Sequence, residues 1–360
     1  MFRRIAVAAL ACSLVSASAC VLGAEDGAGS GSRIVFVYSE KKGQADLHTI
    51  LPNGTGNGRI AAGHYDLPVF SPDRSQIAVV RVDERATAGG RSQRDYQLWV
   101  MNADGSNPHV VASEFGFAVR PTWMPDSKRL VYSHENGIHL VASDGKSAKQ
   151  IGEGLSPHPS PDGDSIVFTR YQEGVSDVWI MQADGSNVRR VANGTNPRWS
   201  PQGDRLLFLL RRMVVNSLGH QNSVYDLWVM RADGRGQKRL DEDAGLGVLA
   251  IPEWSPSGAW IAYHHDSNVW VVNPEDGNRR QLTRIDRRQS SRGPLETEQT
   301  LSICWSPDST RVAFVHSGLT FGGSVMPSKM SRQIRMVNVD GSELRNVTLF
   351  RGASEDPDWR

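Results

Sequence analysis

The sequence is poor in cysteine, in net charge and in long apolar runs. Only three of the 360 residues are cysteines, so a disulfide framework does not hold the fold together. The formal net charge at pH 7 is +1, which argues against a general nucleic-acid binder, because such proteins usually carry a strongly basic surface. Beyond the N-terminus no apolar run has the length of a membrane-spanning helix. Hydrophobic residues still make up 39% of the chain, which is enough for a large core.

The sequence also lacks the motifs of common enzyme classes. It contains no G-x-S-x-G elbow, no P-loop, no Rossmann fingerprint, no H-E-x-x-H motif and no cysteine pair with metal-ligand spacing. We therefore predict no catalytic residue and no cofactor, and we expect a protein that is not an enzyme. Cys304, far from the other two cysteines, is expected to be a small buried apolar residue.

The N-terminal segment has the composition of a targeting signal. A basic MFRR start precedes a short apolar stretch that ends in Ala-Ser-Ala, the small-x-small form of a signal peptidase site. We predict a signal peptide over residues 1–24, a flexible linker over 25–32 and a periplasmic or secreted mature protein. The alternative is a lipoprotein signal over residues 1–19 with a lipid anchor on Cys20. Ala17 stands where lipoproteins usually carry leucine, which favours plain export.

Two short signatures recur along the rest of the chain. The first begins in most copies with Pro-x, followed by an aromatic residue or a substitute for it. Ser-Pro, a turn residue and an apolar run follow in most copies. The second is Asp-Gly, preceded by a run such as LWVM and followed by a short apolar segment. The first signature begins at Pro68, Pro121, Pro157, Pro197, Pro252 and Ile303. The second begins at Asn102, Ala142, Gln182, Arg231, Pro274 and Asn338.

The chemistry of these turns predicts the fold class. Proline presets the backbone for a turn, and Asp and Gly adopt turn geometries that other residues resist. Asp-Gly between apolar runs is a strong hairpin signal, so each repeat reads as two hairpins with four strands, a to d. The repeats are spaced by about 36 to 55 residues, in the range of propeller repeats. We therefore predict an all-β protein with the β-propeller fold.

The ends of the sequence complete the count of blades. Six repeats begin with a visible strand a. The segment Arg33–Glu40 reads as a strand b with no strand a before it, and Pro357–Arg360 reads as a strand a with no strand b after it. Joined, they make a seventh blade. We predict a seven-bladed propeller over residues 33–360, in which the two ends of the chain close one blade.

The repeats carry a resemblance to a known family. The segments PRWSPQGDRLLF, DLWVMRADG and DVWIMQADGSNVRRV resemble the repeats of the TolB-type β-propeller family. The resemblance implies a propeller in the bacterial cell envelope with a role in protein interaction. Two features depart from the family pattern: the separate α/β domain of TolB is not seen before Arg33, and TolB propellers usually have six blades.

The strand order predicts two different faces. The a–b and c–d turns are short and lie on one face, which we call the turn face. The opposite face, which we call the long-loop face, carries the b–c and d–a connections. We expect a partner to bind there, because long loops on a rigid scaffold usually carry binding. The long loops begin at Val82, Arg211, Thr283 and His316.

Two register positions collect polar residues and are our candidate binding site. Aligning the b strands places their last residues at one position, and the strand-a residues that precede the repeat tryptophans form a second set beside it. Together they predict a polar funnel at the channel mouth. The candidates at the b-strand ends are Arg81, His134, Arg170, His265 and His316. The candidates on strand a are His158, Arg198 and Glu253.

Three interpretations of these polar residues stay open. They form a site for an anionic ligand or partner segment through arginine forks, or the histidines with Glu253 hold a divalent metal, or they are solvated strand ends. The partner is expected to be an envelope protein, a peptide or a glycan, with no nucleic acid, and the chain to be a monomer. The alternative function is a metal-dependent polysaccharide lyase or hydrolase of the oligogalacturonate-lyase type, an enzyme class with a similar repeat. The recurring tryptophans are expected to pack between blades.

Overall fold

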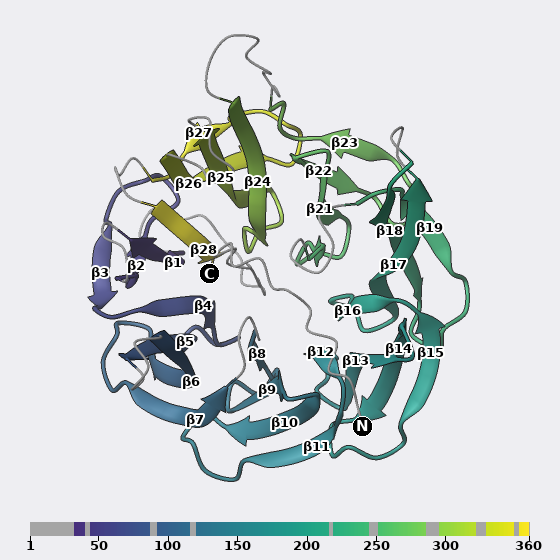
Figure 1. Cartoon of the computed structure of the whole chain (residues 1–360), viewed down its shortest axis with the longest axis horizontal. Coiled ribbons are helices and arrows are strands. Elements are labelled where there is room, and N and C mark those ends of the chain that lie inside the picture. The colour runs from purple at the N-terminus through teal and green to yellow at the C-terminus, as the bar shows by residue number, and fades with distance from the viewer. Residues whose placement is uncertain are drawn as a thin grey trace.

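The recurring Ser-Pro and Asp-Gly turns connect successive antiparallel strands, which form seven four-stranded sheets in the computed structural model (Figure 1). Residues 1–31, with the predicted signal peptide, Cys20 and most of the linker, lie outside the described residues. No helix long and apolar enough to cross a membrane occurs in the described part of the chain. The structure describes residues 32–39, 44–86, 92–115, 120–215, 219–244, 251–285, 295–321, 329–348 and 353–359.

We number the blades 1 to 7 in chain order and name their strands from the channel outward. Blade 1 contains β28 (Ala353–Trp359), β1 (Ile34–Ser39), β2 (Asp46–Ile50) and β3 (Gly58–Ala61). Blade 2 contains β4 (Tyr65–Phe70), β5 (Gln76–Ala86), β6 (Ser92–Asn102) and β7 (His109–Phe115). Blade 3 contains β8 (Thr122–Trp123), β9 (Arg129–His134), β10 (Gly137–Ala142) and β11 (Lys149–Glu153).

The remaining four blades follow the same order. Blade 4 contains β12 (Leu155–Pro159), β13 (Ser165–Gln172), β14 (Val175–Gln182) and β15 (Arg189–Asn193). Blade 5 contains β16 (Thr195–Trp199), β17 (Arg205–Val215), β18 (Gln221–Arg231) and β19 (Lys238–Asp241). Blade 6 contains β20 (Glu253–Trp254), β21 (Ile261–His265), β22 (Asn268–Val272) and β23 (Arg279–Gln281). Blade 7 contains β24 (Leu295–Trp305), β25 (Arg311–Phe321), β26 (Lys329–Asn338) and β27 (Arg345–Asn346).

Blade 1 is built from both ends of the propeller sequence. β28 pairs antiparallel with β1, with Ile34 opposite Trp359 and Val35 opposite Asp358. β28 is therefore the strand a that the sequence lacks before β1. This pairing confirms the predicted closure and the count of seven blades.

A buried serine holds the a–b turn in most blades. Ser306 is fully buried; its hydroxyl donates to Asp308 Oδ1 at 2.5 Å and accepts a hydrogen bond from the Arg311 N–H at 2.8 Å. The same pair of bonds recurs around Ser160 and Ser71. The Ser-Pro-Asp signature thus satisfies its own backbone inside the turn, which explains why it repeats.

The hydrophobic core is divided among the interfaces between neighbouring blades. Trp199 packs with Val167 of blade 4 and with Phe208 of its own blade 5. The indole N–H of Trp123 donates to the Val69 carbonyl of the preceding blade at 3.1 Å. The predicted packing role of the tryptophans is confirmed for the strand-a residues that are described and buried, namely Trp123, Trp199, Trp254 and Trp305. The strand-c tryptophans lie partly buried in the same kind of interface: Trp99, Trp179, Trp228 and Trp270.

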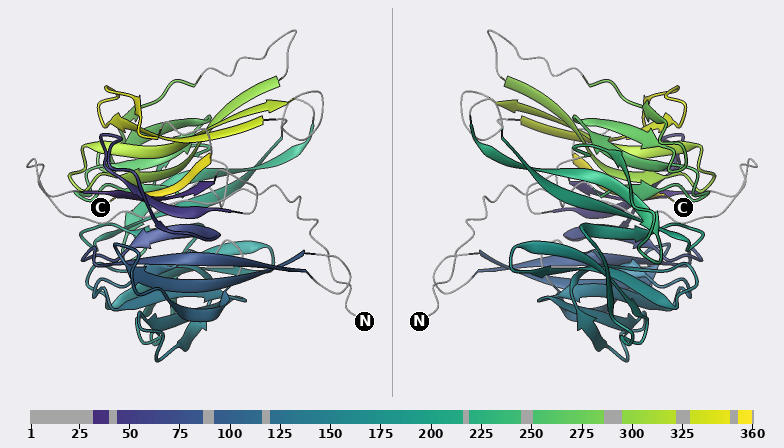
Figure 2. Two further views of the ribbon diagram at one scale, coloured as in Figure 1. Left: turned by 90° about the vertical axis from the view of Figure 1, so that its left-hand side faces the viewer. Right: turned by 90° about the vertical axis from the view of Figure 1, so that its right-hand side faces the viewer.

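Three of the predicted long loops are mostly paired strands. β17 and β18 continue to pair as far as Val215 opposite Gln221, although β16 pairs with β17 only up to Leu209. The β5–β6 and β25–β26 pairs are also long, and Figure 2 shows the three ribbons projecting from one face. The expectation of loops was wrong for these segments, because side chains on the two strands stay in register well beyond the blade.

Candidate functional site in the central channel

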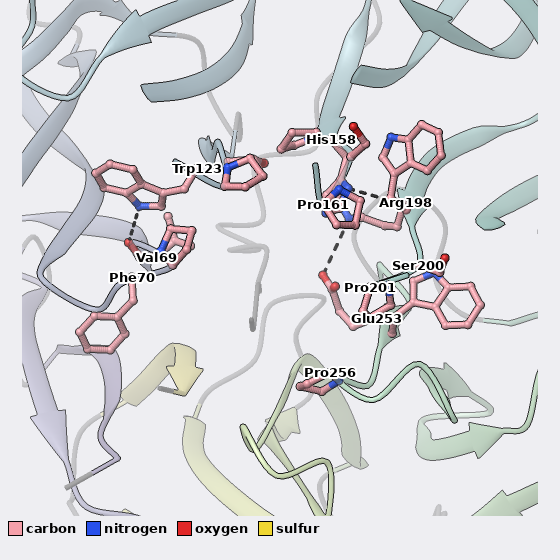
Figure 3. Close-up of a pocket in the computed structure, with 17 residues that line it drawn as sticks. Val69, Phe70, Trp123, His158, Pro161, Arg198, Ser200, Pro201, Glu253 and Pro256 are labelled. Atoms are coloured by element: carbon pink, nitrogen blue, oxygen red, sulfur yellow. Dashed lines mark hydrogen bonds and ion pairs between the residues drawn. The ribbon is translucent and has the colours of Figure 1, made fainter. Parts of the chain in front are cut away.

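In each described inner strand, one residue precedes the repeat tryptophan or its substitute. Five of these residues line a cavity of about 220 Å³ (Figure 3). Cys304 holds the same register position in blade 7 and is fully buried, as expected. The five lining residues come from blades 2 to 6 in order: Val69, Thr122, His158, Arg198 and Glu253.

The rim of the cavity is formed by the a–b turns. Each turn contributes the proline of its Ser-Pro or Met-Pro pair, and in blades 3, 5 and 6 the repeat tryptophan also borders the cavity. The cavity is therefore at the turn end of the channel, whereas the sequence predicted binding at the long-loop face. The rim prolines are Pro72, Pro125, Pro161, Pro201 and Pro256.

A bulge in the inner strands precedes the polar residues of blades 4 and 5. Ser156 and Asn196 adopt left-handed φ values of 52° and 51°, and the strand register shifts just before His158 and Arg198. The Ser156 hydroxyl donates to Asn196 Oδ1 at 3.0 Å, which joins the two bulges. Bulges bend a strand and redirect the next side chains, so they place the polar residues on the channel.

Three charged side chains meet across the channel. Glu253 Oε1 lies 3.9 Å from Arg198 Nε and 3.9 Å from an Arg120 guanidinium nitrogen. These side chains are only 6 to 9% exposed. Contacts of 3.9 Å are Coulombic and too long for direct hydrogen bonds. Among the described residues Glu253 is the only acid within ion-pair distance of Arg198.

His158 completes the cluster as a neutral side chain. Its Nδ1 accepts a hydrogen bond from the Trp199 backbone N–H at 3.3 Å, which leaves the proton on Nε2. Burial and then the charges of Arg198 and Arg120 lower the pKa of His158 well below its usual value. By accessible area His158 is half-buried, because it borders the open channel.

The cluster of Arg120, His158, Arg198 and Glu253 contains two arginines and one glutamate. Burial lowers the pKa of Arg198, and the negative charge of Glu253 opposes this effect. An arginine stays protonated near neutral pH even after such a shift. Two guanidinium groups therefore face the carboxylate of Glu253 in a largely apolar wall, where charges interact strongly.

The residues at the b-strand ends do not join this cluster. Arg81 stacks on Trp99, with its guanidinium carbon 4.9 Å from the ring centroid, and Arg170 stacks on Trp179 at 4.7 Å. His265 lies edge-on to Trp270 in the same way. Each contact joins a strand-b end to the ring on the neighbouring strand c. The side chains at this shared register position therefore each pack within their own blade.

The two remaining predicted histidines also lie within their own blades. His134 packs near the ring of His139, which takes the place of the strand-c tryptophan in blade 3. His316 is buried on β25, opposite Thr300 of β24. Of the predicted funnel, the structure brings together only His158, Arg198 and Glu253. Among the described residues no three His, Cys, Asp or Glu side chains converge as metal ligands would.

Arg120 was missed by the sequence analysis. It immediately precedes the repeat proline Pro121, whereas the aligned residues in blades 2, 4 and 5 are Leu67, Ser156 and Asn196. Extending the repeat alignment by one residue would have exposed this charge. Its reach across the channel from blade 3 to blade 6 cannot be read from the repeat, because the repeat specifies register within one blade only.

Comparison with known proteins gives partial sequence matches to two family models. Residues 82–213 match the model of the TolB beta propeller domain, and residues 216–318 match that of the dipeptidyl peptidase IV N-terminal region. The Tol-Pal system protein TolB of Anaeromyxobacter sp. (strain K) is 29% identical over 104 residues, which are 27% of this chain. That match spans 24% of the TolB relative's own length.

Solved structures share the fold over most of the chain. TolB from Acinetobacter baumannii has a TM-score of 0.50 at 19% identity, covering 91% of this chain and 82% of its own. Oligogalacturonate lyase from Vibrio parahaemolyticus has a TM-score of 0.53 at 12% identity, covering 88% of this chain and 86% of its own. Both likenesses concern the fold alone. The family model over residues 82–213, the TolB sequence relatives and the ring of seven four-stranded sheets together support a TolB-like β-propeller family for this chain.

Proposed function

We propose that this protein is a non-enzymatic binding module of the bacterial cell envelope, which holds a segment of an envelope partner in the central channel. The observation that carries the proposal is the buried cluster of Arg120, Arg198, Glu253 and His158. The predicted signal peptide supports export, and the TolB-like propeller supports a protein partner.

The energetics of the cluster favour a binding role over a structural one. Burying a charged group costs several kcal/mol even when it is paired, and Arg198 and Glu253 are buried together with 3.9 Å between Nε and Oε1. Apolar side chains of similar volume would hold the inner strands together at lower cost. A buried charged cluster that borders a cavity is therefore a candidate binding site.

The same cluster offers no evident machinery for bond cleavage. His158 Nδ1 already accepts the Trp199 N–H, so it does not face a nucleophile as a base would. The polysaccharide lyase alternative is supported only by a shared fold at 12% identity, and a fold does not carry a function. We therefore propose binding and no reaction.

Substitution of Arg198 tests the proposal against a matched control. Arg198 and Arg170 belong to neighbouring blades, but only Arg198 reaches the cluster; Arg170 stacks on Trp179. Tagged wild-type, Arg198→Ala and Arg170→Ala proteins would be used to capture partners from envelope extract. We expect Arg198→Ala to reduce capture at least tenfold, since losing a buried charge contact costs about 2 to 5 kcal/mol. Arg170→Ala should capture normally.

The outcome is interpreted only for variants that fold. Far-UV circular dichroism and the melting temperature would show that Arg198→Ala keeps the propeller. Undiminished capture by a folded Arg198→Ala protein would rule out the channel as the binding site.

A further inference from the structure

We infer that Met213, on the ribbon of β17 and β18, is a site of reversible oxidation. A peroxide converts its thioether to a sulfoxide, and Arg211 and Ser223 hold the new oxygen by hydrogen bonds. The ribbon projects from the body of the propeller (Figure 2). Met213 is not among the residues that line the channel cavity, so the inference goes beyond the proposed function and does not depend on it.

Met213 differs from the other described methionines in its access to solvent. It is 49% exposed. The other methionines whose exposure the structure describes are only 0 to 2% exposed: Met101, Met124, Met181, Met230 and Met336. An oxidant must touch the sulfur to react with it, so burial protects a thioether. Within this set, Met213 is therefore the methionine that a small oxidant in solution reaches first.

Two hydrogen-bond donors converge on the sulfur of Met213. Ser223 lies directly opposite Met213 in the β17–β18 register, and its hydroxyl donates to Met213 Sδ at 3.4 Å. Arg211 precedes Met213 by two residues on the same face of the strand, and its Nη2 donates to Sδ at 3.6 Å. Arg211 Nε also donates to Ser223 Oγ at 2.9 Å. The three side chains therefore form one connected group on the surface of the ribbon.

These donors suit an oxygen acceptor better than a sulfur. A thioether is a weak acceptor, whereas oxidation makes the methionine side chain strongly polar. Hydrogen bonds from a guanidinium group are charge-assisted and gain most from a polar acceptor. The rotatable bonds of methionine let the new oxygen turn toward Arg211 and Ser223. The oxidised side chain therefore finds hydrogen-bond partners already in place, whereas a sulfoxide in the core would disrupt the packing.

The reaction balances with hydrogen peroxide as the oxidant. A lone pair of Met213 Sδ attacks one peroxide oxygen and the O–O bond breaks. The second oxygen takes up the proton of the first and leaves as water. The sulfur is oxidised by two electrons, and the peroxide is reduced by two. A thiol-dependent reductase reverses the step, because two of its thiols become a disulfide while the sulfoxide oxygen leaves as water.

Oxidation changes the character of one face of the ribbon. Alternate residues of a strand share a face, so Arg211, Met213 and Val215 lie on the same side of β17. Val215 is 66% exposed, and with Met213 it supplies exposed apolar surface on this side. The sulfoxide replaces part of that apolar surface with a polar group. The ribbon therefore becomes less apolar under oxidising conditions, while the buried core of the blade is untouched.

Peptide mapping by mass spectrometry tests the site of oxidation. The full chain would be treated with dilute hydrogen peroxide, and the gain of one oxygen atom would be followed at Met213 and at Met230 of the paired strand. We expect Met213 to be oxidised at least tenfold faster than Met230, and methionine sulfoxide reductases to restore its original mass. Equal rates in a protein that stays folded by circular dichroism, or a Met213 sulfoxide that the reductases leave unchanged, would overturn the inference.

Amide hydrogen exchange over residues 211–225 tests the hydrogen bonds to the sulfoxide. In the wild type, peroxide treatment should change the exchange rates by less than twofold. In an Arg211→Leu/Ser223→Ala double variant it should raise them at least threefold, because the new oxygen then competes for backbone N–H groups of the ribbon. The Met213→Leu protein, which cannot form the sulfoxide, should not respond. The same response in the wild type and the double variant, whether large or small, would overturn the role of Arg211 and Ser223.

Discussion

Two histidines with depressed pKa values illustrate how single residues couple this fold to pH. His264 is 4% exposed, and its Nδ1 lies 2.7 Å from Thr300 Oγ1 of the next blade. Burial lowers the pKa of His264 to about 3. His158 shifts in the same direction through burial and the nearby arginines. Both side chains are neutral in the folded protein near pH 6, where they are partly protonated in the unfolded chain.

The sign of this effect gives a prediction for stability. A histidine whose folded pKa is depressed contributes stability above its unfolded pKa of about 6.5, and this is lost as pH falls toward the folded pKa. Between pH 7 and pH 5 the loss from His264 alone is about 2 kcal/mol. We expect His264→Gln, which retains a side chain able to bond Thr300, to flatten the pH dependence of the free energy of urea unfolding by that amount. An unchanged pH slope would show that His264 does not titrate in this way.

At the residue scale, the sequence identified three of the four cluster residues. It wrongly placed the residues at the b-strand ends in the same site. His158, Arg198 and Glu253 were found because they share a register position that every blade repeats. Arg81 and Arg170 share another position for a different reason, since each stacks on a strand-c tryptophan. A repeat reveals which residues are equivalent, but equivalent residues converge only when their side chains point to the axis.

Among the elements, the c–d turns join each blade to the one before it. In blade 4 Gly185 has φ of 93°, and a Cβ there would overlap the Ile151 carbonyl of blade 3. Gly105 approaches the Ile60 carbonyl of blade 1 in the same manner. The glycine of the Asp-Gly turn therefore meets two requirements. It adopts the left-handed backbone, and it allows the neighbouring blades to pack closely.

A pair of glycines in blade 4 separates these two needs. Gly174 in the b–c turn has φ of 86° with open space around its Cβ position, whereas Gly185 has both constraints. We expect Gly174→Ala to cost about 1 kcal/mol for the left-handed backbone. Gly185→Ala should cost about 1 to 3 kcal/mol more, because of the overlap with Ile151. Urea unfolding of both variants measures the difference, and equal costs would show that the blades adjust freely.

The elements were largely predictable from the sequence, but their lengths were not. Turn chemistry is local, so the Ser-Pro and Asp-Gly signatures correctly predicted a–b and c–d turns at their positions. The ribbon of β17 and β18 was read as a loop, because its outer half buries few side chains and its apolar pattern is weak. Strand pairing there depends on cross-strand register, which composition does not reveal.

The whole molecule is a closed ring with two unlike faces. One face carries the three ribbons, and the other carries the short turns (Figure 2). The cavity with its charged cluster lies at the turn face. The ring and its closure by β28 were predictable, since both ends of the sequence supply parts of one repeat. The face that holds the candidate site was not, because loop length pointed to the ribbons and the cavity depends on side chains from five blades.

Site-specific photo-crosslinking tests most directly which face binds the partner. Benzoylphenylalanine would replace Pro161 at the channel rim in one protein and Asn222 on the β17–β18 ribbon in another; both positions are exposed. With envelope extract, we expect the Pro161 probe to crosslink the captured partner. The Asn222 probe should give little product. A partner crosslinked at Asn222 and not at Pro161 would contradict the central claim that the turn-side channel is the binding site.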